Sequence, residues 1–201
     1  MVPRNTGWVE IVVGCMFSGK TSELIRRLTR ATIGQQRVLA FKPKVDTRNA
    51  ADSLVSHPGV FEDRQEFWAV SVASSETILA ASADAEVVGI DEVQFFDAGL
   101  PDVVERLARR GKRVICAGLD LDYRGQPFGV VPELMARADQ VDKTYAVCMI
   151  CGAPATRSQR IADSDETVLI GAIAAYQARC RAHWSPEPVL SKQANRDFAE
   201  G

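Results

Sequence analysis

Gly14-Cys15-Met16-Phe17-Ser18-Gly19-Lys20-Thr21 contains two glycines and a Lys-Thr pair at a fixed spacing. An apolar run over residues 8–13 precedes it, and a helical pattern over residues 20–33 follows it and stops near Gly34. The pattern G-x-x-x-x-G-K-[ST] between a strand and a helix indicates a phosphate-binding loop, because N–H groups at a helix start attract an anion. A chance Gly-rich turn is the alternative, and the flanking strand and helix favour the phosphate loop.

Strand and helix patterns alternate along the rest of the chain. Because parallel strands joined by helices form a sheet covered on both faces, the alternation predicts an α/β fold with a P-loop (RecA-like) parallel sheet. Between the second and third strands, residues 44–65 are polar and irregular, and we expect a long loop there. The pattern predicts strands over residues 8–14, 37–41, 66–72, 85–91 and 112–118, and helices over 20–33, 74–84, 100–110 and 131–138.

Composition sets limits on the function. The chain has 201 residues and a formal net charge of −2. This charge gives no general footprint for nucleic acid. No apolar run approaches the length of a membrane span, and the first residues have no apolar signal core. We therefore expect a cytoplasmic protein with no nucleic-acid or membrane partner.

A second motif completes the expected phosphate site. The apolar run at residues 85–90 ends in the acid pair Asp91-Glu92. Lys20 can reach the β- and γ-phosphates, and the hydroxyl of Thr21 and the carboxylate of Asp91 suit Mg²⁺. Glu92 points elsewhere and can accept a proton from a hydroxyl in a kinase, or orient a water in an ATPase. An ordinary pair of loop acids is the alternative, because many strands end in Asp.

The cysteines indicate a structural zinc site. Cys148-x-x-Cys151 and Cys180-x-x-His183 are two half-sites with the spacing of a tetrahedral metal centre. A redox pair and unrelated buried cysteines are the alternatives, but no thioredoxin-like pattern surrounds Cys148 and a second half-site exists. Four protein ligands leave no open position, so we expect structural rather than catalytic zinc. Cys116 lies in an apolar strand pattern and is expected in the core.

Zinc would tether the segment between its half-sites. Residues 152–179 then form a loop that can bring backbone donors and acceptors onto a flat ligand. Tyr176 lies four residues before Cys180, and Tyr123 and Phe128 lie in a Gly-rich stretch after a sheet strand. Aromatic rings around such loops suit stacking on a base, although each is more often a core residue.

We expect three regions in the chain. Residues 1–143 form the nucleotide-binding α/β domain. Residues 144–184 form a small C-terminal zinc-binding domain with a substrate-gripping (lasso) loop. Residues 185–201 are a tail with no informative pattern, which we expect to be disordered.

Four motifs together resemble a known family. They are residues 14–21, Asp91-Glu-Val-Gln-Phe-Phe96, residues 118–129, and the Cys148, Cys151, Cys180 and His183 set. In this order, from about residue 8 to 184, they resemble the zinc-containing (type II) thymidine kinases. A generic phosphate-loop protein would share only the first two.

The resemblance implies transfer of the ATP γ-phosphate to the 5′-hydroxyl of thymidine, giving thymidine monophosphate, with deoxyuridine as a further candidate acceptor. It implies Glu92 as the general base, Mg²⁺ beside ATP, and a homotetramer inhibited by thymidine triphosphate. By the same resemblance, the phosphate site comprises Gly14, Ser18, Gly19, Lys20, Thr21, Asp91, Gln94, Asp46 and Arg48. The nucleoside site comprises Met16, Leu119, Tyr123, Phe128, Ser158, Gly171 and Tyr176.

Some positions depart from the family pattern. Ser158 stands where Thr is commoner near the thymine, so local packing can differ. Ala172 stands where a second Gly is frequent, which restricts the loop backbone. The fourth zinc ligand, His183, is Cys in some relatives, and both bind zinc well. None of these changes removes a catalytic part.

Two other classes of function fit part of the sequence. A nucleic-acid-stimulated ATPase with a zinc module would be expected to show a basic stripe, and the Lys and Arg residues are scattered. A non-catalytic nucleotide-binding regulator would not need the intact Lys20, Asp91 and Glu92. We therefore expect a kinase.

Overall fold

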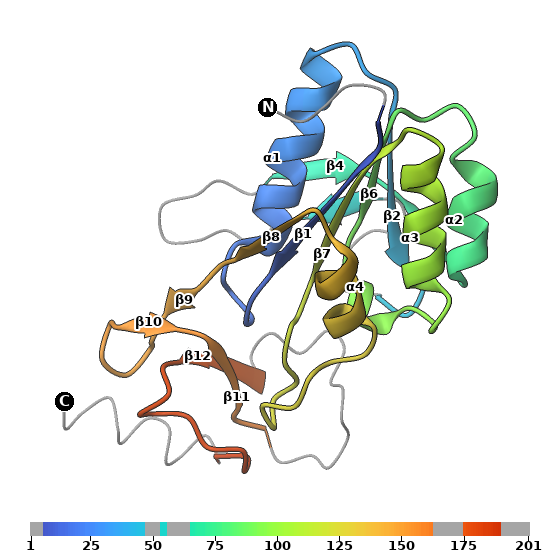
Figure 1. Cartoon of the computed structure of the whole chain (residues 1–201). Coiled ribbons are helices and arrows are strands. Elements are labelled where there is room, and N and C mark those ends of the chain that lie inside the picture. The colour runs from blue at the N-terminus through green and yellow to red at the C-terminus, as the bar shows by residue number, and fades with distance from the viewer. Residues whose placement is uncertain (1–5, 47–52, 56–64, 163–174, 190–201) are drawn as a thin grey trace.

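The computed structural model describes residues 6–46, 53–55, 65–162 and 175–189 (Figure 1). The helices are α1 (Lys20–Ile33), α2 (Ser75–Ala81), α3 (Leu100–Arg109) and α4 (Val131–Arg137), with a short 3-10 helix η1 (Val93–Phe95). The strands of the main sheet are β1 (Trp8–Val13), β2 (Val38–Pro43), β5 (Val70–Val72), β6 (Val87–Ile90), β7 (Arg113–Gly118) and β8 (Gln140–Lys143). The strands of three small sheets are β3 (Ser53–Val55), β4 (Glu66–Trp68), β9 (Ala146–Val147), β10 (Pro154–Ala155), β11 (Arg157–Arg160) and β12 (Tyr176–Arg179).

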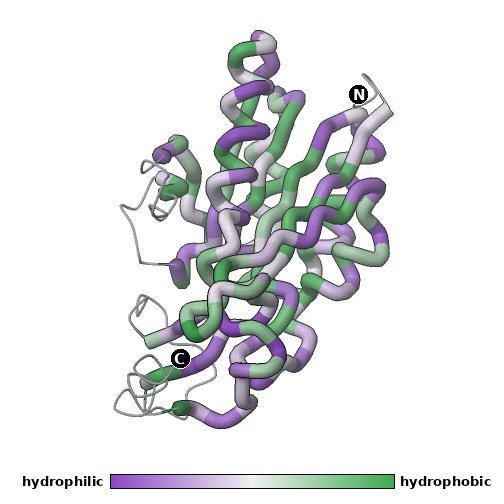
Figure 2. The backbone as a smooth tube through the Cα atoms, turned by 90° about the vertical axis from the view of Figure 1, so that its left-hand side faces the viewer, coloured by the Kyte–Doolittle hydropathy of each residue, from purple (hydrophilic) through white to green (hydrophobic). Residues whose placement is uncertain are grey.

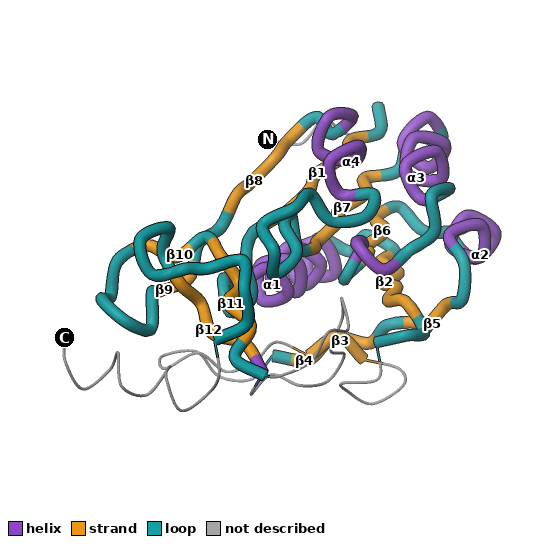
Figure 3. The backbone as a smooth tube through the Cα atoms, turned by 90° about the horizontal axis from the view of Figure 1, so that it is seen from below, coloured by secondary structure: helices purple, strands orange, loops and turns teal. Residues whose placement is uncertain are grey.

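The main sheet has six strands in the order β5-β2-β6-β7-β1-β8, and every pairing in it is parallel. Helix α1 lies on one side of it, and α2, α3 and α4 lie on the other (Figures 1 and 3). This arrangement confirms the predicted α/β fold with a parallel sheet and flanking helices. Because the strands are parallel, their carboxyl ends share one edge, where ligand sites of such sheets are found.

Each face of the sheet has its own core. Successive strand residues point to opposite faces. Ile11 therefore packs with α3 and α4, whereas Val12 packs with Leu24 and Leu28 of α1. Figure 2 shows the hydrophobic central strands beside helices whose hydrophilic residues recur along their length.

The segment before β5 differs from the prediction. The expected loop at residues 44–65 contains β3, which pairs with β4 in an antiparallel ribbon. The strand expected over 66–72 is divided, because β4 belongs to this ribbon and β5 pairs with β2 in the main sheet. Ala69, between them, is fully buried. The apolar pattern was continuous, and only tertiary contacts separate its two halves.

The start of α2 also differs in detail. Ser74 occupies the predicted cap position but makes no capping hydrogen bond to the backbone. Instead, Asp97 accepts hydrogen bonds from both the backbone N–H (2.8 Å) and the hydroxyl (2.6 Å) of Ser75. The cap therefore comes from a residue distant in sequence, which no local pattern could indicate.

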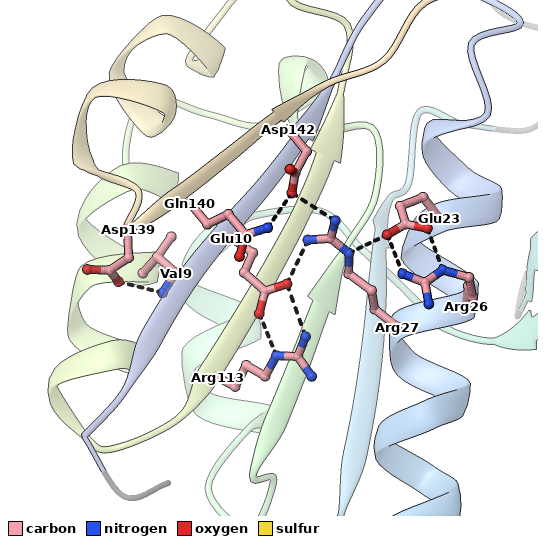
Figure 4. Close-up of polar contacts among 9 residues, drawn as sticks. All are labelled: Val9, Glu10, Glu23, Arg26, Arg27, Arg113, Asp139, Gln140 and Asp142. Atoms are coloured by element: carbon pink, nitrogen blue, oxygen red, sulfur yellow. Dashed lines mark hydrogen bonds and ion pairs between the residues drawn. The ribbon is translucent and has the colours of Figure 1, made fainter. Parts of the chain in front are cut away.

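A charged network joins α1 to the sheet (Figure 4). Arg27 of α1 contacts Glu10 of β1 at 2.7 Å, Asp142 of β8 at 2.8 Å and Glu23 at 2.7 Å. Glu10 is 1% exposed and also pairs with Arg113 of β7 at 2.6 Å. Hydrogen bonds that Glu23 accepts from Arg26 and Arg27 outweigh desolvation and lower the pKa of Glu23 to about 2. The network fixes the helix that begins with Lys20 against three strands.

Four short strands follow the main sheet. β9 pairs with β10 and β11 pairs with β12, each in an antiparallel ribbon. They lie beyond the carboxyl edge of the main sheet, on the far side from α2 and α3 (Figure 3). Residues 185–189 of the expected tail are described and bond back to β11, where Ser185 donates to Gln159 and Val189 donates to Arg160. Residues 190–201 lie outside the described part.

Among the described residues, no helix combines the length and the apolar character needed to cross a membrane.

Candidate active site

The loop after β1 needs its glycines for different reasons. Gly14 has φ +155°, and a side chain there would meet the carbonyl oxygen of Thr144 at 2.4 Å and the Ser18 hydroxyl at 2.8 Å. Gly19 has φ +79° but open space around it. Gly14 is therefore required by crowding and Gly19 by backbone conformation. Thr144, the residue after β8, also donates to the Ser18 hydroxyl at 2.9 Å, a contact that the sequence did not indicate.

Lys20 begins α1 with its ammonium group turned into the loop. Its Nζ donates to the carbonyl oxygen of Cys15 at 2.7 Å, and Ser18 Oγ donates to the same oxygen at 2.8 Å. Burial lowers the pKa of Lys20, while the nearby carboxylates of Glu92 and Asp91 oppose this shift. The site therefore brings a buried cation near the acid pair, as a phosphate-binding site requires.

Thr21 and Asp91 meet across 70 positions of sequence. Thr21 Oγ1 donates to Asp91 Oδ2 at 3.0 Å. Asp91 follows β6, is 5% exposed, and accepts the backbone N–H of Glu92 through its other oxygen at 2.9 Å. A hydroxyl and a carboxylate side by side at the carboxyl edge are a donor set that suits Mg²⁺.

Glu92 has a left-handed backbone, with φ 51° and ψ 42°. This conformation is costly for a residue with a long side chain and is often found at functional sites. Its carboxylate accepts from Gln94 Nε2, and Gln94 Oε1 accepts the backbone N–H of Leu119 at 3.0 Å. Glu92 is 8% exposed. The turn after β6 therefore points the side chains of Asp91 and Glu92 in different directions. Gln94 links the carboxylate of Glu92 to the turn after β7.

Two aromatic residues of the segment after β7, Tyr123 and Phe128, contact different partners. The ring of Phe128 packs edge-on against Phe95 at a centroid distance of 5.7 Å. Tyr123 is 5% exposed, and the guanidinium of Arg160 lies 3.7 Å from its ring centroid. Arg160 also donates to the hydroxyl of Tyr176 at 2.6 Å. The structure thus brings Tyr123 and Tyr176 to one buried cation, Arg160, which the sequence reasoning had not singled out.

Four of the remaining predicted site residues lie in the described part of the chain, and two do not. Met16 and Leu119 are half-buried, while Ser158 is buried, with its hydroxyl 3.0 Å from the backbone nitrogen of Met16. Asp46 is buried after β2. Two predicted site residues, Arg48 and Gly171, lie outside the described residues.

The four predicted metal ligands form one cluster. The ligand atoms of Cys148, Cys151, Cys180 and His183 all lie within 4.8 Å of one another. Sulfur atoms at tetrahedral zinc are about 3.8 Å apart, and Cys151 Sγ lies 3.8 Å from Cys180 Sγ. Desolvation opposes ionisation of Cys148, but backbone hydrogen bonds outweigh it and lower the pKa of its thiol to about 6. The donor set and its spacing therefore fit zinc.

Two of the five cysteines, Cys15 and Cys116, lie outside the metal cluster. Cys116 is fully buried in the core, as predicted, and burial raises the pKa of its thiol to about 12. Cys15 is 2% exposed and donates to the carbonyl oxygen of Ala155 at 3.2 Å. Burial raises the pKa of Cys15. Neither thiol has the depressed pKa of a reactive cysteine.

Comparisons with known proteins agree with this geometry. The family model described as "Thymidine kinase" matches residues 7–184. The thymidine kinase of Coprothermobacter proteolyticus is 48% identical over 183 residues, which cover 88% of this chain and 90% of the relative. Residues 7–184, which the family model matches, include the phosphate loop, the acid pair and all four candidate metal ligands.

Proposed function

Because the chain belongs to the thymidine kinase family, we propose that its site transfers the γ-phosphate of ATP to the 5′-hydroxyl of thymidine, giving thymidine monophosphate. The observation that carries the proposal is the pair at the end of β6. Asp91 bonds Thr21 of the phosphate loop, and the next residue, Glu92, is turned away by its left-handed backbone. A phosphate site and a separate carboxylate are the two parts that a kinase needs.

The donor half consists of the phosphate loop and its neighbours. The ammonium group of Lys20 stabilises the charge on the transferring phosphate. Thr21 and Asp91 would hold Mg²⁺, which would neutralise negative charge on the phosphates. The other residues of this half are Gly14, Ser18, Gly19, Gln94, Asp46 and Arg48.

The half of the site that binds the nucleoside lies between the turn after β7 and the ribbon formed by β11 and β12. Glu92 accepts the proton of the 5′-hydroxyl as the oxygen attacks phosphorus. Its hydrogen bond from Gln94 orients the carboxylate. The thymine lies among the other predicted residues, namely Met16, Leu119, Tyr123, Phe128, Ser158, Gly171 and Tyr176.

Zinc, held by the cysteine and histidine cluster, has a structural role. Cys148 precedes the β10 strand, and Cys180 and His183 follow β12. The ion would therefore fix both ends of the segment that carries Ser158 and Tyr176. We assign residues 144–184 to this zinc-binding domain and residues 1–143 to the nucleotide-binding domain.

The family also suggests assembly and regulation. We propose a cytoplasmic homotetramer that thymidine triphosphate inhibits. Inhibition of this kind would be measured as a rise in the apparent KM for a substrate as the triphosphate is added.

A nucleoside panel tests the function. Each nucleoside is incubated with ATP and Mg²⁺, and ADP is measured. We expect thymidine-dependent ADP formation, with deoxyuridine as the second acceptor to compare. ADP formation that depends on DNA and on no nucleoside would contradict the proposal and favour a nucleic-acid-stimulated ATPase.

A further inference from the structure

One peptide group in the phosphate loop is held from both ends. The carbonyl oxygen of Cys15 accepts from Lys20 Nζ at 2.7 Å and from Ser18 Oγ at 2.8 Å. The N–H of the same peptide group belongs to Met16, and it donates to Ser158 Oγ at 3.0 Å. Because a peptide group is planar and its C=O and N–H point in opposite directions, fixing one end fixes the other.

The support for this peptide comes from the zinc-held strands. Ser158 is 5% exposed and lies in β11, opposite Ala178 of β12, which is two residues before the ligand Cys180. A second contact reaches the same part of the loop, where Cys15 Sγ donates to the carbonyl oxygen of Ala155 at 3.2 Å. The hydroxyl of Ser158 is therefore placed by a paired strand beside the metal cluster and not by the loop itself.

We propose that Ser158 is a positioning residue of the ATP half of the site, acting on Lys20 through the Cys15–Met16 peptide. The proposal rests on the proposed function in that ATP phosphates bind in the loop. The hydrogen bond from Met16 keeps the Cys15 carbonyl turned toward Lys20 and Ser18. A phosphate loop must present N–H groups to the anion, and a carbonyl that turned into the cradle would repel it.

Preorganisation explains why this contact would matter for affinity. Without the Ser158 hydroxyl, the peptide can rotate, and ATP binding must then bear the cost of ordering it. The contact also uses the N–H of Met16, so this donor orders the loop and does not serve a phosphate oxygen. The zinc-binding ribbon would thereby support both halves of the site, although the resemblance assigns it only to the nucleoside.

The two assignments of Ser158 differ in a measurable way. If its hydroxyl positions the phosphate loop, Ser158→Ala weakens ATP binding and leaves the KM for thymidine unchanged. If its side chain contacts thymine, the same change raises the KM for thymidine and leaves ATP binding unchanged. A general loss of stability would not separate the two constants.

The test measures binding of a non-hydrolysable ATP analogue with Mg²⁺ by calorimetry, without nucleoside, and then both KM values. Loss of one hydrogen bond predicts about fivefold weaker analogue binding and a similar rise in the KM for ATP in Ser158→Ala. Ser158→Thr keeps the hydroxyl and should bind the analogue like the wild type. Ser82→Ala is the matched control, because Ser82 is fully buried and donates to Ile78 at the far end of the sheet.

Unchanged analogue binding in Ser158→Ala, with a raised KM for thymidine, would overturn the proposal. Equal weakening in Ser158→Thr and Ser158→Ala would also overturn it, because the hydroxyl would then not be responsible. Absence of thymidine phosphorylation in the wild type would contradict the proposed function alone. The binding comparison uses no nucleoside and would still decide the role of Ser158.

Discussion

The roles of some site residues can be predicted from the sequence, and those of others cannot. The spacing of Gly14, Gly19 and Lys20 predicts a phosphate loop because each position has one physical requirement. The left-handed backbone of Glu92 and the buried cation Arg160 are not visible in the sequence, because both arise where separate strands meet. A charged residue in a short polar segment such as Arg157-Ser-Gln-Arg160 gives no sign that it will be fully buried.

Crowding at Gly14 can be separated from backbone strain. Gly14→Ala should lower the free energy of unfolding by about 2–4 kcal/mol. The new methyl group would clash with the Thr144 carbonyl oxygen, and the positive φ adds backbone strain. Gly19→Ala, at positive φ in open space, should cost about 1 kcal/mol. Urea unfolding measures both. Equal losses would contradict the role of crowding.

At the scale of elements, the buried strands and amphipathic helices were predicted well. Each of the five expected strands and four expected helices has a counterpart, with ends shifted by a few residues and the strand over 66–72 divided in two. The missed elements are β3, η1 and the strands from β8 onward. β8 reads Gln-Val-Asp-Lys and lies at an edge of the sheet, so it lacks the apolar run of a central strand. The short ribbons β9–β12 depend on tertiary contacts for their identity.

The buried charges that hold α1 provide a test at this scale. Arg27 and Arg26 both pair with Glu23, but only Arg27 also contacts Glu10 and Asp142. Arg27→Met should lower the free energy of unfolding by about 3 kcal/mol, because Glu10 loses a buried partner. Arg26→Met, whose side chain is half exposed, should cost less than about 1 kcal/mol. Chemical unfolding at pH 7 checks the pair, and a similar small loss in both variants would refute the structural role of the network.

At the scale of the whole molecule, the candidate zinc cluster brings together two segments that are distant in sequence. Its four ligands come from a turn after β9 and a turn after β12, and the strands between them contact the phosphate loop through Ser158 and Ala155. The spacing alone predicted this set of four residues, because a C-x-x-C pair together with a C-x-x-H pair is typical of a zinc site. It could not predict that the strands between the half-sites would contact Cys15 and Met16.

Loss of one ligand should release the metal and destabilise the molecule. Cys151→Ala should lower the measured zinc-to-chain ratio from near unity toward zero and lower the thermal unfolding temperature, because zinc binding stabilises only the folded state. Cys116→Ala is the control. Cys116 lies in the core and is not one of the four candidate ligands, so this variant should keep its full complement of zinc. A full complement of zinc in Cys151→Ala would contradict the assigned ligand set.

The central claim is that Glu92 accepts the proton of the thymidine 5′-hydroxyl at a site where Lys20 binds the ATP phosphates and where Thr21 and Asp91 would bind Mg²⁺. The most direct test is the rate of thymidine monophosphate formation by Glu92→Gln, measured beside binding of an ATP analogue. Gln is similar in size but is not a base, so we expect a fall of at least about 100-fold in kcat with analogue binding unchanged. Turnover by Glu92→Gln close to that of the wild type would contradict the account.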